Sequence, residues 1–288
     1  MSAVARVVEI WRYPVKSMGG ERLTACTLGP RGIPGDRGWA IRDEAAGEIR
    51  GAKKLPQLLL CAARYVEEPA EGRIPPAEIT LPRGERVRSD RAEAAERLGM
   101  LLGRRVTLWP LRPPEDAAHY RRGLPDKPDM EAELRDVFGR LPDEPLPDLM
   151  VFPQELFEYT SIPGTYFDAL PVHLVTTTTL GALGRGNRAS RFDVRRFRPN
   201  FVIEPEGDAT DGFVENGWAG RRLRIGGAAV GVEMPTPRCV MTTLPQGDLP
   251  KDPAVLRTIV RDAGQNIGMY AEVVSAGPVG IGDPVELV

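Results

Sequence analysis

The sequence predicts a mainly β protein with a few helices, an α+β chain in which two β-rich halves are joined by a polar segment. Two observations favour this fold class. Short apolar and β-branched runs, separated by Gly, Pro or charged turns, fill residues 4–112 and return after residue 200. Between them, residues 113–165 are rich in Pro, Asp and Glu, which is typical of a linker or an irregular excursion.

The chain length sets how many domains to expect. A chain of 288 residues suits one large domain or two ordinary ones and can bury a sizeable core. We expect a first β-rich domain over residues 1–112, whose strand spacing fits a small barrel or sandwich. The linker or excursion then covers 113–165, and a second β-rich domain covers 166–288.

The first half contains short strand patterns and one helix pattern. The helix is expected over "SDRAEAAERLGMLLGR" (89–104), where Ser89 or Asp90 could cap its start and Gly103 could end it. The strand-like runs are "VARVVEIWRYPV" (4–15), "RLTACTLG" (22–29), "RGWAIRD" (37–43), "LPQLLLCAARYV" (55–66), "AEITLP" (77–82) and "RVTLWPL" (105–111).

The second half is again mostly strand. A helix over "PAVLRTIVRDAG" (253–264) has Asp252 as its expected cap ahead of Pro253, and some helix is expected within 129–139. "PVHLVTTTTLGALGRG" (171–186) predicts a strand, a turn and the start of a helix. The remaining strand patterns are "NFVIEP" (200–205), "LRIGGAAVGVEM" (223–234) and "AEVVSAGPVGIGDPVEL" (271–287).

Composition excludes several function classes. A hydrophobic content of 42%, a charged content of 27% and a net charge of -2 are ordinary for a soluble protein and predict neither nucleic-acid nor membrane binding. Arg6 and Glu9 lie where a signal peptide would need its apolar core. No run of about 18 apolar residues is present. We therefore expect a cytoplasmic protein.

The three cysteines are far apart and odd in number, which argues against a disulfide framework. Together with only two histidines they cannot build a metal centre by themselves, so a metal would have few protein ligands or arrive inside a cofactor. Cys26 and Cys61 lie in apolar runs and are expected to be buried. Cys239 follows Arg238 in a proline-braced loop, and a neighbouring cation favours the reactive thiolate. A small buried side chain is the alternative interpretation of Cys239.

Four stretches have anion-binding character, because each places cations or hydroxyls at a turn. None is a P-loop, and each alone also fits ordinary solvated side chains. One sequence cannot show whether they converge. The stretches are "YPVKSMGG" (13–20) with Lys16 and Ser17, "GIPGDRGWA" (32–40) with Asp36 and Arg37, "TTTT" (176–179) and "RRFRPN" (195–200).

Several motifs resemble one known family. "RRFRPNFVIE" (195–204), "W-x-G-x-x-LRIG" (218–226), "PTPRCVMTT" (235–243) and "GDPVEL" (282–287) resemble the MOSC domain, named after the C-terminus of molybdenum cofactor sulfurase. "YPVKSMGG", "GIPGDRGWAI" and "KKLPQLLL" resemble its companion N-terminal β-barrel domain. The resemblance covers most of the chain except about 113–165. It implies two barrel domains, as in the amidoxime-reducing components and their bacterial relatives.

The resemblance also implies a cofactor and its contacts. In this family a cysteine thiolate is the protein ligand of molybdenum in a pterin cofactor, the molybdenum cofactor (Mo-molybdopterin), and by match this ligand is Cys239, with Arg238 beside the metal as a second catalytic residue. The matched phosphate contacts are Lys16, Ser17, Arg37 and Arg198, and further expected contacts are Thr176, Thr177, Thr178 and Asn200.

The activity implied is reduction of small N-oxygenated compounds such as hydroxylamines and amidoximes. No C-x₄-C-x₂-C ferredoxin spacing occurs in the chain, so electrons would come from a separate donor protein of ferredoxin or flavin-reductase type. Three alternatives remain open: a sulfur-carrier or cofactor-handling module with a Cys239 persulfide, a pyridoxal-phosphate-binding protein with Lys16 as its Schiff base, and a β-barrel interaction protein without cofactor. The physiological substrate and the oligomeric state are not indicated.

Overall fold

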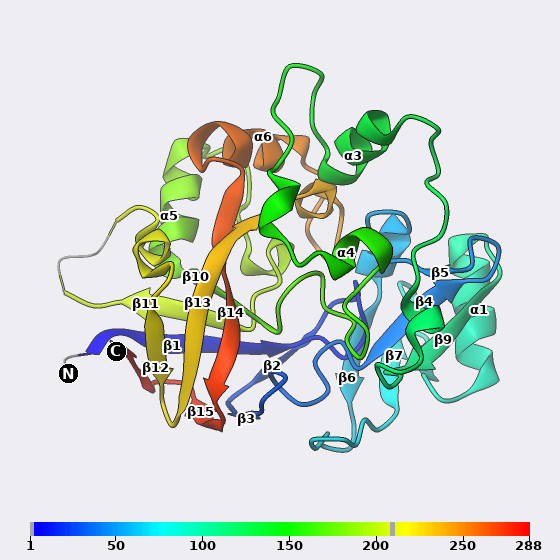
Figure 1. Cartoon of the computed structure of the whole chain (residues 1–288), viewed down its shortest axis with the longest axis horizontal. Helices are drawn as coiled ribbons and strands as arrows, with labels where there is room; N and C mark the ends of the chain where they lie inside the picture. Colours follow the sequence, from blue (N-terminus) through cyan, green and yellow to red (C-terminus); the bar gives the residue numbers. More distant parts are fainter. Residues whose placement is uncertain (1–2, 208–210) are drawn as a thin grey trace.

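The computed structural model describes residues 3–207 and 211–288. It confirms a mixed α+β fold with a closed β-barrel and few helices. In Figure 1 the barrel lies on the left, and two small sheets with α1 lie on the right. Within the described residues, no helix has both the length and the apolar character needed to cross a membrane.

The barrel closes through seven of the described strands, in the order β1-β11-β10-β14-β13-β12-β16 and back to β1. Only β10 and β11 run parallel within this ring. Its apolar interior includes Val7, Leu174 and Val230, all fully buried. The strands are β1 (Ala3–Arg12), β10 (Val172–Thr176), β11 (Phe201–Pro205), β12 (Arg222–Ile225), β13 (Ala228–Pro237), β14 (Asn266–Ser275) and β16 (Pro284–Leu287).

Strands from the beginning of the chain are built into this barrel. One edge of β1 pairs with β11, and its other edge pairs first with β16 and then with β2. A separate ladder joins β3 to β15 near the end of the chain. These pairings fix the first loops of the chain against the barrel. The additional strands are β2 (Glu21–Leu23), β3 (Ala25–Leu28) and β15 (Gly277–Gly280).

The two small sheets enclose a second apolar core with α1 (Ala92–Leu102). They consist of β4 (Trp39–Asp43), β5 (Glu48–Ile49) and β9 (Val106–Pro110), and of β6 (Ala62–Tyr65), β7 (Ala77–Thr80) and β8 (Arg86–Arg88). The strand pattern predicted over 55–66 is partly wrong, because residues Pro56–Leu60 form the 3-10 helix η1. Pro56 has no N–H for a ladder, and the consecutive Leu58 and Leu59 are both buried, without the alternation of a strand.

The predicted helix over 89–104 is confirmed, but its predicted cap is wrong. The N-cap of α1 is Arg91, without a side-chain capping bond, and the Ser89 hydroxyl accepts a hydrogen bond from Ala77 N (2.9 Å) instead. Gly103 ends the helix with φ 63°, as predicted. The Ser89 hydroxyl therefore binds strand β7 and does not cap the helix.

Helices α5 (Thr177–Gly186) and α6 (Pro253–Asp262) pack on each other and on the barrel strands. The predicted cap of α6 is confirmed, since Asp252 Oδ1 accepts from Ala254 N (3.0 Å). Segment 113–165 contains α2 (Ala117–Tyr120), α3 (Met130–Phe138), η2 (Leu149–Val151) and α4 (Glu155–Glu158), and Figure 1 shows it (green) running above the junction of barrel and small sheets. The remaining 3-10 turns are η3 (Val194–Arg196), η4 (Val214–Trp218) and η5 (Val240–Thr243).

Candidate functional site

A cavity of about 500 Å³ lies where the barrel, the small sheets and segment 113–165 meet. Loops distant in sequence contribute to it, and its lining includes many cationic side chains. Most of the sequence-predicted site residues line this cavity: Lys16, Ser17, Arg37, Arg198, Asn200, Arg238 and Cys239. The anion-binding stretches and the cysteine loop therefore do converge in space, with the exception of the threonine tract.

Backbone strain is concentrated at this cavity. Within residues 3–207 and 211–288, four non-glycine residues have positive φ, and three of them line it: Ser17 (68°), Arg37 (49°) and Arg198 (55°). Such a conformation costs on the order of 1–3 kcal/mol and persists where the surrounding structure enforces it. Each of the three residues belongs to a stretch that the sequence marked as anion-binding. Strain at all three positions indicates that the loops are shaped for the site.

The loop after β1 positions Lys16 and Ser17. The Ser17 hydroxyl accepts a hydrogen bond from Ala52 N (2.9 Å), which ties this loop to the one before η1. Lys16 is 7% exposed, and its Nζ donates to Tyr166 O (2.7 Å) and to Asp168 Oδ1 (2.9 Å). Burial lowers the pKa of Lys16, although Asp168 opposes that shift. Because an ammonium has three N–H groups, one donor of Lys16 is left for a ligand.

Arg37 is held in the Asp-Arg turn by its neighbour Asp36, with which it forms an ion pair. Its Nη2 donates to Arg198 O (3.3 Å), and its guanidinium lies 4.6 Å from the centre of the Tyr13 ring. Burial favours the neutral form, but Asp36 outweighs burial, and the pKa of Arg37 is raised. The guanidinium is therefore a permanent cation at the cavity wall.

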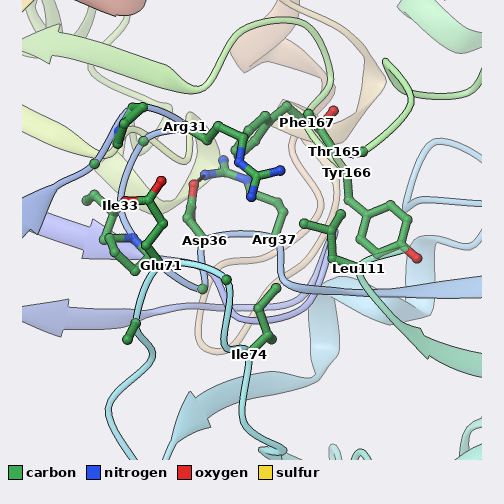
Figure 2. Close-up of a pocket in the computed structure, with 18 residues that line it drawn as sticks. Arg31, Ile33, Asp36, Arg37, Glu71, Ile74, Leu111, Thr165, Tyr166 and Phe167 are labelled. Carbon is green, nitrogen blue, oxygen red and sulfur yellow. Dashed lines mark hydrogen bonds and ion pairs between the residues drawn. The ribbon is translucent and has the colours of Figure 1, made fainter. Parts of the chain in front are cut away.

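A smaller cavity also borders this turn, and Figure 2 shows the residues that line it. Its volume is about 70 Å³, and its lining includes Arg31, Glu71 and Leu111. It shares Arg37 and Phe167 with the larger cavity. A space of this size holds a few water molecules and no cofactor. The larger cavity is therefore the candidate site.

Arg198 has a buried donor group that could bind a ligand. Its guanidinium stacks 4.2 Å from the centre of the Tyr13 ring and donates through Nη1 to Met18 O. Its buried Nη2 finds no hydrogen-bond partner among the described residues. Burial, together with the adjacent Arg37, lowers the pKa of Arg198 to about 10. A buried donor without a partner is costly, so an acceptor supplied by a ligand fits this position.

Asn200 has a supporting contact pattern. Its Nδ2 donates to Asp36 Oδ2 (2.9 Å) and Trp11 O (3.3 Å), and its Oδ1 accepts from His173 N (3.1 Å). Asn200 is 1% exposed. The side chain thus links the barrel strands to the carboxylate that holds Arg37, and its amide is largely engaged by the protein itself.

Cys239 lies where β13 ends and η5 begins. Its carbonyl accepts hydrogen bonds from Thr242 N (3.2 Å) and Thr242 Oγ1 (3.0 Å), which fixes the turn. Its side chain is half-buried and lines the cavity. Cys61 is buried in the core of the small sheets, as expected, whereas Cys26 is only partly buried and packs against the barrel core. Burial raises the pKa of each of their thiols to about 12. Only the loop cysteine is thus placed among the cations.

Arg238 is fixed by several acceptors. Its Nε donates to Ile267 O (3.0 Å), its Nη1 to Phe197 O (3.1 Å), and its Nη2 to His173 Nε2. Burial lowers the pKa of Arg238 to about 10, and burial together with Arg238 holds the pKa of His173 well below its ordinary value. A neutral His173 can accept from the guanidinium. The pair therefore anchors the backbone that precedes Cys239.

The threonine tract lies elsewhere. Thr176 caps α5 by accepting from Thr179 N (3.3 Å), and its hydroxyl donates to Glu215 Oε2 (2.5 Å). Thr179 also donates to Glu215. Neither Thr176, Thr177 nor Thr178 is among the described residues that line the cavity. The hydroxyl of Thr176 is thus engaged by a buried carboxylate.

Sequence reasoning missed many side chains that line the cavity, among them Lys53, Asp168 and Tyr270. Lys53 forms no ion pair within the described part of the chain, and its Nζ lies 6.0 Å from the centre of the Phe138 ring. Burial opposes its charge, but the nearby Asp168 and Cys239 together outweigh burial, and the pKa of Lys53 is raised. The Lys-Lys pair at 53–54 was a visible signal for Lys53. Asp168 and Tyr270 stand in no motif.

The described residues hold no cluster of three or more His, Cys, Asp or Glu side chains that could bind a metal ion by itself. A metal at this cavity would need most of its ligands from a cofactor. Cys239 is the one thiol in the lining.

Comparisons with known proteins identify the family. The MOSC domain model matches residues 158–286, and the MOSC N-terminal beta barrel domain model matches residues 4–82. The two matches appear in the order expected for the two-domain members. The chain belongs to the MOSC-domain family. No curated protein matches the chain.

Among solved structures, YiiM from Geobacillus stearothermophilus is 22% identical over 41% of this chain and 54% of its own, with a TM-score of 0.29. YiiM from Escherichia coli is 16% identical over 41% of this chain and 54% of its own, with a TM-score of 0.30. The YUAD protein from Bacillus subtilis is 12% identical over 99% of this chain and 95% of its own, with a TM-score of 0.44. The chain spans about half the length of the YiiM structures that it matches.

Proposed function

We propose that this protein binds the molybdenum cofactor, with the Cys239 thiolate as the protein ligand of the metal, and reduces small N-oxygenated compounds. One observation carries the proposal. A half-buried thiol and several cations, drawn from loops distant in sequence, line the same cavity of about 500 Å³. Soft thiolate suits molybdenum, and a pterin dithiolene brings its own sulfurs, so a chain without a metal cluster of its own can hold this metal.

The donor set fits the anionic end of such a cofactor. Arg198 offers a buried Nη2 without a partner, and Lys16 has a donor to spare. Arg37 adds a permanent cation that faces the same space. Arginine and lysine are the side chains that proteins use for phosphate. Asp168 and Asp36 pair with Lys16 and Arg37, whereas Arg198 has no such carboxylate partner among the described residues, so an anionic ligand fits best beside Arg198.

The protein's own part in the reaction is positioning. The Arg238–His173 pair fixes the backbone before Cys239, and Asn200 fixes Asp36 and through it Arg37. The ammonium of Lys53 lines the same cavity, and its proposed role is to hydrogen-bond the oxygen that leaves. When bound, the cofactor supplies the two-electron chemistry. An N-hydroxylated substrate takes up two electrons and two protons and leaves as an amine and water, with electrons from a separate donor protein.

The test uses protein made in a host that synthesises the cofactor. We expect about one molybdenum and one pterin per chain, and reduction of N-phenylhydroxylamine to aniline with reduced viologen as an artificial donor. Protein that carries neither metal nor pterin and gives no reduction would contradict the proposal. In that case, release of sulfide from Cys239 by a thiol reductant would favour the sulfur-carrier alternative.

A further inference from the structure

The cavity lining also contains a group of apolar side chains from one segment. Segment 122–160 provides these side chains, and most of this segment falls between the two family matches, 4–82 and 158–286. The lining here includes Leu124, Met130, Phe138, Phe152, Leu156 and Phe157. This apolar wall, defined by these six residues, belongs to a part of the chain that neither family model covers.

Several side chains of the apolar wall remain uncovered. Leu124 is 89% exposed, Met130 is 56% exposed and Phe157 is 54% exposed, although all three line a cavity. Scattered exposed apolar residues need no explanation, but apolar side chains from one segment that line a cavity together with cationic groups are typical of a ligand site. Ligand pockets commonly combine such walls with a few convergent polar groups.

The apolar wall is attached to the cationic side by directed contacts. Asp126 accepts from Arg50 (2.6 Å) and Lys54 (3.0 Å). Arg122 donates to Leu156 O (2.8 Å), which joins the beginning of segment 122–160 to its end. These bonds hold the apolar side chains in place over the polar site. The wall and Cys239 therefore line the same cavity.

We propose that the apolar wall binds the body of the substrate, so that the preferred substrates are N-oxygenated compounds with an aromatic or extended aliphatic group. This inference rests on the proposed function. The cationic side takes the anionic end of the cofactor, and the N–O group of the substrate points to Cys239. The body of the substrate then contacts the apolar wall. Hydroxylamine itself, which has no apolar body, is a poor substrate.

The experiment compares hydroxylamine, N-methylhydroxylamine, N-phenylhydroxylamine and N-(4-butylphenyl)hydroxylamine, with reduced viologen as the donor. The Leu124→Gln/Phe157→Gln double variant removes apolar character at two exposed positions, so it is expected to fold. We expect it to lose roughly tenfold in kcat/KM for the two aryl substrates and to be unchanged for hydroxylamine. Met150→Gln is the matched control, because Met150 is 77% exposed in the same segment and is not among the described lining residues.

A binding measurement separates this inference from the proposed function. Calorimetry with 4-butylaniline, the reduced product, needs no turnover, and we expect about tenfold weaker binding to the double variant than to Met150→Gln. If no substrate is reduced but 4-butylaniline shows this difference, the apolar site stands and the proposed function fails. If all substrates are reduced and the double variant loses equally on each, or on none, the apolar site is refuted and the function stands.

Discussion

Arg198 offers a quantitative test of the phosphate site. Its buried Nη2 has no partner among the described residues, and the proposed ligand would supply one. A hydrogen bond to a charged group contributes about 1.5–3 kcal/mol, so Arg198→Ala should weaken cofactor binding by roughly 10- to 150-fold. The measurement is the dissociation rate and the equilibrium affinity of pterin cofactor, followed by fluorescence after release.

Loss of Arg198 also removes contacts within the protein. Its Nη1 bond to Met18 O and its stacking on Tyr13 disappear, so the melting temperature must be measured beside the affinity. Arg198→Lys keeps the charge but loses the planar fork, and we expect its affinity to lie between that of the wild type and that of Arg198→Ala. This ordering separates the lost charge from the lost geometry.

Two neighbouring arginines provide the comparison. Arg195 pairs with Asp193 and Asp248 at the surface, so Arg195→Ala should keep the cofactor. Arg196 is 2% exposed and donates to backbone carbonyls such as that of Thr242 (2.9 Å), so Arg196→Ala should lose mainly stability. Equal cofactor affinity in Arg198→Ala and Arg195→Ala would refute the phosphate assignment.

Two further predictions concern His173 and Gly268. Burial and Arg238 hold the pKa of His173 below 6.5, so the unfolded chain binds more protons and stability should fall below about pH 6.5, by at most about 1.4 kcal/mol per pH unit. His173→Gln keeps an acceptor and should flatten this fall in melting temperature between pH 7 and 5, whereas an unchanged slope would assign it to other groups. At Gly268 (φ 75°) a Cβ would lie 2.3 Å from Leu174 O, so Gly268→Ala should destabilise by about 2 kcal/mol or more in chemical denaturation. Gly282→Ala has similar φ (91°) and no described atom within 4 Å of its Cβ, and a loss as large there would show that the close contact is unimportant.

Local chemistry made much of the fold predictable. The helix at 253–262 has its cap, its leading proline and its apolar spacing within one continuous stretch, and the structure has that helix. The barrel closure was not predictable in the same way. It requires β1 to pair with β11 and β16, whose residues lie about 200 or more positions further along the chain. No local sequence pattern indicates which distant strands pair with β1.

The site was predictable only as separate pieces. Lys16, Arg37 and Arg198 stand in recognisable motifs, but their convergence depends on the barrel closure and on backbone strain at their loops. The threonine tract looked suitable for a ligand, yet its hydroxyl at 176 bonds Glu215, which is distant in sequence. Asp168 belongs to no recognisable motif, and its hydrogen bond with Lys16 holds it at the cavity. Long-range contacts decide all of these outcomes.

The most direct test of the central claim is the molybdenum content of Cys239→Ser protein, measured with Cys61→Ser as the control. Serine is nearly isosteric with cysteine but is a harder, far less acidic donor, so a ligand role predicts loss of molybdenum and of N-phenylhydroxylamine reduction with the fold intact. Pterin should persist in part, because its phosphate contacts come from other residues. Cys61→Ser, in the apolar core, should lower the melting temperature and keep the metal. A Cys239→Ser protein with undiminished molybdenum and turnover would contradict the claim.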